Sequence, residues 1–73
     1  MEIIFTNHAK FRIEERKIKF SDIKSVIMDC DKIDRVFGDK VIAKKFFENC
    51  ELEVVYKNNR NKIIVIIAYY IKK

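Results

Sequence analysis

The strongest constraint on the fold of this chain is a change in the spacing of its apolar residues near residue 30. Before this point they recur at helical spacing, as at Ile23, Val26 and Ile27, which fall at i, i+3 and i+4. After it, β-branched and aromatic residues dominate and the period moves toward two. The sequence therefore predicts an α+β fold with helices first and a sheet second.

Two short helices are expected in the N-terminal part. The first should run from about Asn7 to Lys17, with Thr6 or Asn7 as its cap. The second should begin at Ser21, after a short connector. The opening segment, Glu2 to Phe5, is apolar but too brief to assign to an element. The predicted result is a two-helix hairpin.

The remaining residues are predicted to form a sheet of four strands. Gly38-Asp39 suits a type II′ hairpin turn, and Asn58 to Asn61 tolerate the left-handed conformations of a hairpin loop. The strands that these turns separate are Ile33 to Phe37, Lys40 to Phe47, Glu51 to Tyr56 and Lys62 to Ile71. We expect two N-terminal helices packed on a four-stranded antiparallel meander, in one domain spanning residues 1–73.

The last predicted strand is apolar on both faces, unlike the strand before it. In the preceding strand Leu52, Val54 and Tyr56 alternate with polar residues, as expected when only one face of a sheet is covered. Two helices cover only one face, so the second apolar face of the last strand needs a partner. We predict that it contributes to a homodimer or binds another protein, near residues Ile64, Ile66, Ala68 and Tyr70 or their alternates.

Charge and cysteine content narrow the partners and the compartment. Sixteen Lys and Arg against eleven Asp and Glu give a net charge of +5, which suits nucleic acid or an acidic protein, although such an excess also serves solubility. Cys30, Cys50 and one His build no usual zinc site, so neither metal nor cofactor is expected. Two thiols favour a reducing cytoplasm, and their pairing stays open. The longest apolar run, residues 63–71, is about half of the ~20 residues that a membrane helix needs.

The first predicted helix carries a polar stripe with an unusual border. At 100° per residue His8, Arg12, Glu15 and Arg16 lie together, with apolar residues on both edges of the stripe. This arrangement is more typical of a cleft wall than of a solvent face. The alternative is an ordinary surface ion pair between Glu15 and Arg12 or Lys19, with His8 in a polar first turn.

The residue types in this stripe favour phosphate chemistry. A histidine in the first turn feels the positive end of the helix dipole, which disfavours its protonated form and keeps a neutral imidazole available as a base. The forked donors of Arg12 and Arg16 match phosphate oxygens, and Glu15 is placed to orient one of them. Together these groups point to RNA cleavage.

The segment that carries the stripe also resembles a known family. Asn7-His8-Ala9-Lys10-Phe11-Arg12-Ile13-Glu14-Glu15-Arg16-Lys17-Ile18 is similar to a group of small bacterial and archaeal proteins of unknown function, whose opening pattern is His-Ala, then Arg, then Glu-Arg-Gly-Ile. That group is in turn similar to the BrnT and RelE/ParE toxin superfamily. The similarity covers most of the chain and extends to a RelE/barnase-like architecture. Lys17 departs from the pattern, because the group often has Gly at this position.

The resemblance implies a metal-independent endoribonuclease, a toxin whose cognate antitoxin protein is its partner. In that mechanism the ribose 2′-hydroxyl attacks the adjacent phosphate, with His8 as general base or acid and the two arginines stabilising charge on the phosphoryl oxygens. Relatives in the superfamily often carry functional residues on the strands. The candidates for these here are Lys44, Lys45, Tyr69 and Tyr70, of which Tyr69 joins the predicted catalytic set of His8, Arg12, Glu15 and Arg16.

Two other classes of function compete with a ribonuclease. In a non-catalytic nucleic-acid binder, cations would grip phosphates while Phe46 or Tyr56 stacks on bases. The predicted RNA-binding cations are Arg35, Lys44, Lys45 and Arg60. In a protein-interaction module, the apolar sheet face alone would act. ParE-like relatives act on a protein target, so a shared fold does not decide the chemistry.

Overall fold

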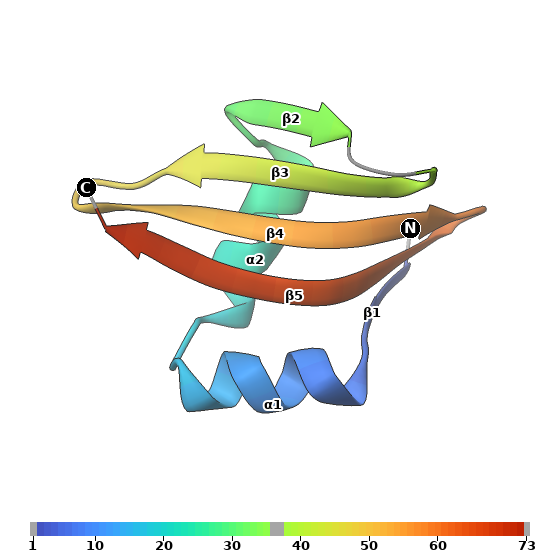
Figure 1. Ribbon diagram of the computed structural model, residues 1–73, viewed down its shortest axis with the longest axis horizontal. Helices are drawn as coiled ribbons and strands as arrows, with labels where there is room; N and C mark the ends of the chain where they lie inside the picture. Colours follow the sequence, from blue (N-terminus) through green and yellow to red (C-terminus); the bar gives the residue numbers. More distant parts are fainter. Residues whose placement is uncertain (1, 36–37, 73) are drawn as a thin grey trace.

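The computed structural model describes residues 2–35 and 38–72, with the backbone alone at Arg35 and Lys72. Within this part the fold is α+β, as predicted, and the strands form one sheet in the order β1-β5-β4-β3-β2 (Figure 1). The elements in chain order are β1 (Glu2–Phe5), α1 (Asn7–Glu15), α2 (Phe20–Met28), β2 (Lys32–Arg35), β3 (Lys40–Phe46), β4 (Cys50–Asn59) and β5 (Lys62–Lys72). Neither helix is long and apolar enough to cross a membrane.

The sheet has one more strand than the four antiparallel strands predicted from the sequence, and the additional strand is β1. This strand pairs in parallel with the first part of β5, from Glu2 beside Lys62 to Phe5 beside Val65, and makes the sheet five-stranded and mixed. A segment of four residues, of which only Ile3, Ile4 and Phe5 are apolar, is too short to show a periodicity of its own. Its assignment as a strand comes from β5, which lies at the other end of the chain.

Both predicted hairpins connect antiparallel strands, and the turn between β4 and β5 is shorter than expected. The pairing of β4 with β5 continues to Asn59 and Lys62, so only Arg60 and Asn61 remain in the loop, and Arg60 adopts a left-handed φ of 58°. The described pairing of β2 with β3 ends at Arg35 beside Val41. Part of the predicted Gly38-Asp39 hairpin, residues 36–37, lies outside the described residues.

Helix α2 covers one face of the sheet, and Figure 1 shows it behind β3, β4 and β5. Its apolar spacing buries Ile23 and Val26 completely against β3 and β4. The sheet contributes the predicted alternating set of β4 to this core: Leu52, Val54 and Tyr56, which are 0%, 0% and 6% exposed. We call the opposite side of the sheet, which faces the viewer in Figure 1, the open face.

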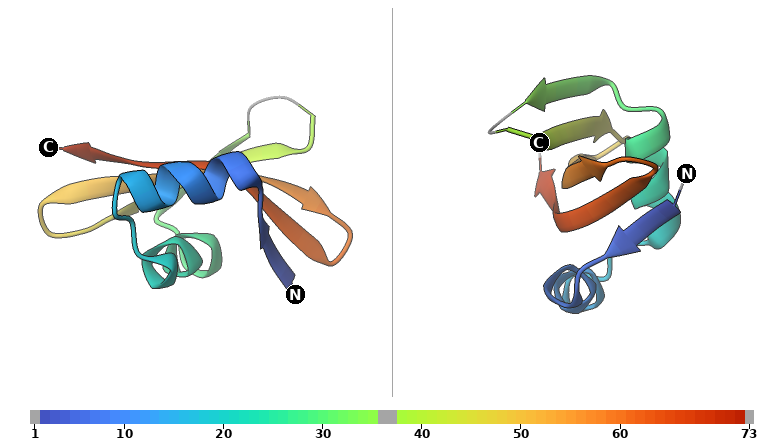
Figure 2. Two further views of the ribbon diagram at one scale, coloured as in Figure 1. Left: turned by 90° about the horizontal axis from the view of Figure 1, so that it is seen from below. Right: turned by 90° about the vertical axis from the view of Figure 1, so that its right-hand side faces the viewer.

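Helix α1 lies beside β5 rather than on a face of the sheet. Figure 2 shows α1 running along the edge of the sheet while α2 lies below it. Ala9 and Ile13 are buried against β5, beyond the stretch of β5 that pairs with β1. Because β1 is so short, the second half of β5 would otherwise expose a bare edge. The helix covers that edge.

Local signals set both ends of α1. The hydroxyl of Thr6 accepts a hydrogen bond from the Ala9 amide (3.1 Å), so Thr6 is the N-cap and the alternative, Asn7, is the first residue of the helix. The helix ends at Glu15, two residues before the predicted end, because Lys17 adopts a left-handed φ of 56°. The Ile18 amide then donates to the Ile13 carbonyl (3.0 Å) and the Lys17 amide to the Glu14 carbonyl (3.2 Å), which is the Schellman arrangement.

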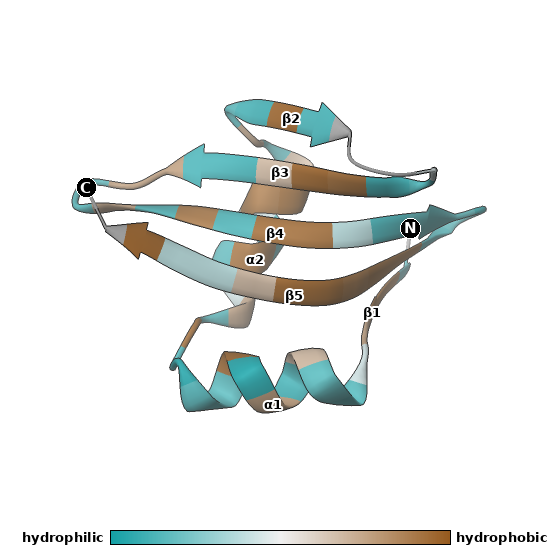
Figure 3. Cartoon of the chain, in the orientation of Figure 1, coloured by the Kyte–Doolittle hydropathy of each residue, from teal (hydrophilic) through white to brown (hydrophobic). Residues whose placement is uncertain are grey.

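A register shift on β5 decides which of its residues face the core. Val55 pairs with Ile67, but Tyr56 pairs with Val65, so the alternation is interrupted at this point. The residues that face the helices are Ile63, Val65, Ala68 and Tyr70, and those on the open face are Ile64, Ile67, Tyr69 and Ile71. The open face therefore takes Ile64 from the predicted set and Ile67, Tyr69 and Ile71 from its alternates, whereas Ala68 and Tyr70 face the helices. Figure 3 shows that β5 is apolar along most of its length.

Candidate functional site

Only two of the four residues in the predicted polar stripe on α1 contact each other through their side chains in the described structure. Arg12 and Glu15 form an ion pair (Nη1 to Oε1, 3.1 Å), with side chains 40% and 50% exposed. Arg16 reaches the sheet instead, where its Nη1 donates to the Ala68 carbonyl of β5 (3.1 Å). His8 is exposed in the first turn and has no hydrogen bond or ion pair among the described residues.

Arg16 thus connects the stripe to the sheet. Its hydrogen bond satisfies a carbonyl on the part of β5 that β1 does not pair with. A guanidinium has five N–H donors, so most of them remain available for another acceptor. The next residue of β5, Tyr69, turns its side chain onto the open face.

Three side chains from three strands meet on that face and form what we call the open-face cluster: Lys44 of β3, Glu53 of β4 and Tyr69 of β5. Lys44, Glu53 and Tyr69 are direct cross-strand neighbours. The Tyr69 hydroxyl donates to Oε2 of Glu53, and Nζ of Lys44 lies 3.2 Å from Oε1. Asp34 of β2 lies at 3.8 Å from the same ammonium group. Each oxygen of the Glu53 carboxylate therefore has its own partner.

The burial of Glu53 strengthens its electrostatic interactions with the other members of the cluster. Glu53 is only 6% exposed, although it belongs to the polar side of β4. A buried carboxylate is costly unless it is paired and hydrogen-bonded, and Tyr69 and Lys44 meet both needs. Among the described residues no buried side-chain nitrogen or oxygen lacks a hydrogen-bond partner.

Glu53 raises the pKa of two neighbouring groups, Tyr69 and Lys44. The hydrogen bond to Glu53, with burial as the second cause, raises the pKa of Tyr69 to about 12. The hydrogen bond and the charge of Glu53 likewise raise the pKa of Lys44 above its ordinary value. At neutral pH the cluster therefore contains a neutral phenol and a charged ammonium around one carboxylate.

The three predicted RNA-binding cations whose side chains the structure describes, Lys44, Lys45 and Arg60, do not lie on one surface. Lys44 belongs to the open face, whereas the neighbouring Lys45 donates to the Asp29 carbonyl (2.8 Å) at the end of α2. Arg60 lies in the β4–β5 loop, where it lines an open hollow of about 520 Å³ with its neighbours. The side chain of Arg35 lies outside the described part of the structure.

Glu53 belongs to the candidate site but was not among the site residues predicted from the sequence. Its alternation with Leu52 and Val54 marked it as an ordinary solvent-facing residue of the strand. The signal that would have identified it is long-range, because its partners come from a strand before it and a strand after it. Of the tyrosine pair on β5, Tyr69 contacts this carboxylate, whereas Tyr70 turns toward α2 and its hydroxyl donates to Asp22 (3.4 Å).

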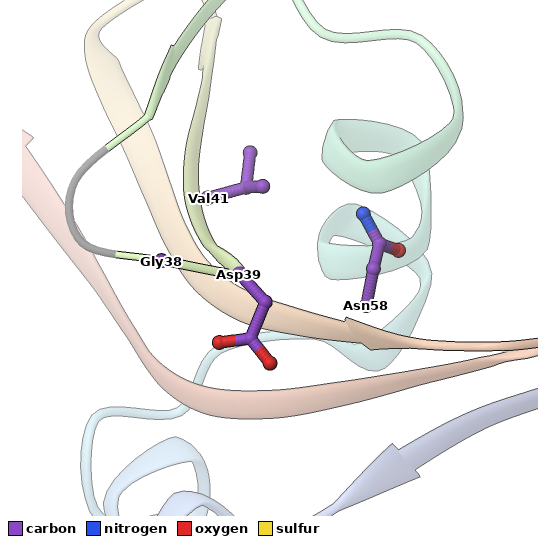
Figure 4. Close-up of a pocket in the computed structure, with 4 residues that line it drawn as sticks. All are labelled: Gly38, Asp39, Val41 and Asn58. Atoms are coloured by element: carbon purple, nitrogen blue, oxygen red, sulfur yellow. The ribbon is translucent and has the colours of Figure 1, made fainter.

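Another hollow lies away from the open-face cluster, and none of the cluster residues lines it. Figure 4 shows one of about 310 Å³ at the β2–β3 turn, lined by Gly38, Asp39, Val41 and Asn58. The Asp39 carboxylate in it pairs with Lys57 (3.7 Å), and its side chain and that of Asn58 do not point toward each other. In the described ranges, no three His, Cys, Asp or Glu residues lie close enough to hold a metal ion.

Comparison with known proteins places the chain in a family. Searches of curated proteins and of solved structures gave no significant match. A family model described as a domain of unknown function, DUF4258, matches residues 5–70. The matched segment includes α1 and every member of the open-face cluster. The chain belongs to the DUF4258 family.

Proposed function

We propose that this protein is an endoribonuclease that cleaves RNA without a metal ion, as the toxin of a toxin–antitoxin pair. One observation carries the proposal: the open-face cluster places a buried carboxylate, a phenol and an ammonium group next to the β5 residue that Arg16 contacts. A proton-transfer pair and phosphate-binding cations are the groups that this reaction needs. The α+β fold with an open sheet face agrees with the resemblance to RelE and BrnT toxins.

The proton transfer is assigned to Tyr69 and Glu53. The ribose 2′-oxygen attacks the neighbouring phosphorus, and the bond from phosphorus to the 5′-oxygen breaks. The 2′-hydroxyl proton passes to the Tyr69 oxygen as the phenol releases its own proton to Glu53. His8 in its imidazolium form is the proposed proton donor to the leaving 5′-oxygen. The mechanism therefore uses His8 as the acid, one of the two roles that the resemblance implies, and not as the base that the helix dipole favours. The products are a 2′,3′-cyclic phosphate and a free 5′-hydroxyl.

Arginine and lysine offset the charge that builds on the phosphoryl oxygens. Arg16 keeps free N–H donors while it is anchored on β5. The Arg12–Glu15 pair is half-exposed and contributes little to stability, so a phosphate can replace the carboxylate at low cost. Lys44 supplies a fixed positive charge beside Glu53.

The decisive experiment compares two adjacent tyrosines. Purified wild-type protein, Tyr69→Phe and Tyr70→Phe are incubated with a synthetic single-stranded RNA in the presence of a chelator, and the products are separated by gel electrophoresis. Tyr69→Phe should lose about 100-fold or more of the cleavage rate. Tyr70→Phe should stay near the wild type, because Tyr70 faces α2. Cleavage by Tyr69→Phe at the wild-type rate would refute the assignment.

The same assay tests His8. His8→Ala should reduce the cleavage rate, but less than Tyr69→Phe does, because His8 has no described contact with the cluster. In cells, growth arrest on expression should follow the same order, and the product of a neighbouring antitoxin gene should relieve it. Full activity of His8→Ala would remove His8 from the mechanism.

A second candidate is a non-catalytic binding module. Ile42, Val55 and Ile67 are neighbours in register and form a half-exposed apolar row across the open face. Such a row suits a second copy of the chain or another protein. Under this alternative the wild type forms no RNA product, and Ile67→Lys changes the oligomeric state measured by sedimentation.

A further inference from the structure

The edge of the sheet at β1 carries backbone groups with no partner in the described structure. The amides of Glu2 and Thr6 donate to β5-side carbonyls, those of Asn61 (3.1 Å) and Val65 (3.3 Å). Successive peptide groups of a strand point in opposite directions, so those of Ile3 and Phe5 point away from β5. Neither residue makes a backbone hydrogen bond on that side within residues 2–35 and 38–72. This edge can therefore accept another strand.

A hollow lies directly beside this edge. It has a volume of about 360 Å³ and is lined by Ile3 and Phe5 of β1 and by Phe20 and Lys24 of α2, and we call it the edge hollow. Phe5 and Phe20 meet edge to face, with ring centroids 5.0 Å apart, yet Phe20 remains 48% exposed. The walls are thus mainly apolar and aromatic, with one ammonium group among them.

We propose that β1 binds an extended acidic segment of a partner protein by strand addition. The backbone of that segment would pair with Ile3 and Phe5, and a bulky apolar side chain would enter the edge hollow. A carboxylate of the segment would lie near Lys24. The net charge of +5 favours an acidic partner over a second copy of this chain. The inference does not depend on RNA cleavage, because the edge hollow and the open-face cluster share no residue.

The test uses two short peptides of opposite charge as probes. One is acetylated and amidated Glu-Val-Leu-Val-Glu, and the other has Lys at both ends in place of Glu. The full-length protein is labelled with ¹⁵N, and binding is followed by shifts of its backbone amide signals. The acidic peptide should shift the signals of Ile3, Phe5 and Lys24. A version of the peptide methylated on its central backbone nitrogens should not bind, because it cannot pair with an edge.

Reversing the charge of Lys24 separates an effect on binding from an effect on folding, because a misfolded variant would bind neither peptide. Lys24→Glu should bind the acidic peptide about two- to fivefold more weakly and the Lys peptide more tightly than the wild type does. Lys40→Glu is the matched control, because it changes the net charge equally at an exposed position on β3.

Three outcomes would overturn the proposal. The first is that the acidic peptide leaves the Ile3 and Phe5 signals unchanged. The second is that Lys24→Glu and Lys40→Glu weaken binding equally, which would indicate general charge attraction only. The third is that the same signals shift with protein concentration alone, which would assign the edge to a second copy of the chain.

Discussion

Replacing Lys17 with glycine should stabilise the protein. Lys17 holds a left-handed φ of 56° so that the Ile18 amide can reach the Ile13 carbonyl (3.0 Å) and close α1. A side chain in this conformation costs roughly 1–2 kcal/mol, which glycine avoids. Glycine also gives the unfolded chain more freedom, which removes about 0.4–1 kcal/mol of that gain. From the midpoints of these two ranges, the expected net increase in the free energy of unfolding is about 0.8 kcal/mol.

Urea unfolding followed by circular dichroism measures this change, and thermal unfolding should show a rise of roughly 3–6 °C. Lys10→Gly is the control, because Lys10 is exposed in the middle of the same helix. Glycine there should lower the free energy of unfolding by about 0.7 kcal/mol, since helical glycine is unfavourable. The same substitution should therefore have opposite signs at two positions seven residues apart. If Lys17→Gly also destabilises the protein, Lys17 is not strained in the left-handed conformation that closes α1.

Three further predictions follow from the contacts of single residues. Tyr69 should ionise near pH 12, and Glu53→Gln should move this pKa toward the ordinary 10, measured by tyrosinate absorbance. Because the folded-state pKa is raised, the stabilisation from the Tyr69–Glu53 bond is complete below pH 10 and is lost as the pH rises toward 12; an unshifted titration would contradict it. Thr6→Ala should cost about 1 kcal/mol and speed hydrogen exchange at the Ala9 amide, and an unchanged exchange rate would argue against the cap. Ile13→Ala should cost about 2–5 kcal/mol in urea unfolding, because this side chain is 1% exposed against β5; a loss below 1 kcal/mol would place it outside the core.

Sequence patterns predicted those features of the fold that depend on residues close together in the chain. The cap at Thr6, the buried spacing of Ile23 and Val26, and the alternation of Leu52, Val54 and Tyr56 each depend on residues a few positions apart. For the same reason the order of helices and hairpins could be predicted. The polar stripe on α1 was also visible in the sequence, and it contains Arg16, which contacts the sheet.

What only the tertiary structure decided depends on pairing between distant segments. The strand β1 exists because β5 offers it an edge, and the register shift at Val55 and Tyr56 chooses which residues of β5 face the helices. Glu53 gains its partners in the same way, since Lys44 and Tyr69 reach it only once three strands are aligned. By itself the amino-acid sequence determined the helices, the hairpins and most of the buried residues, because these follow from spacing along the chain. The location of the candidate site followed from strand register, which short-range spacing does not encode.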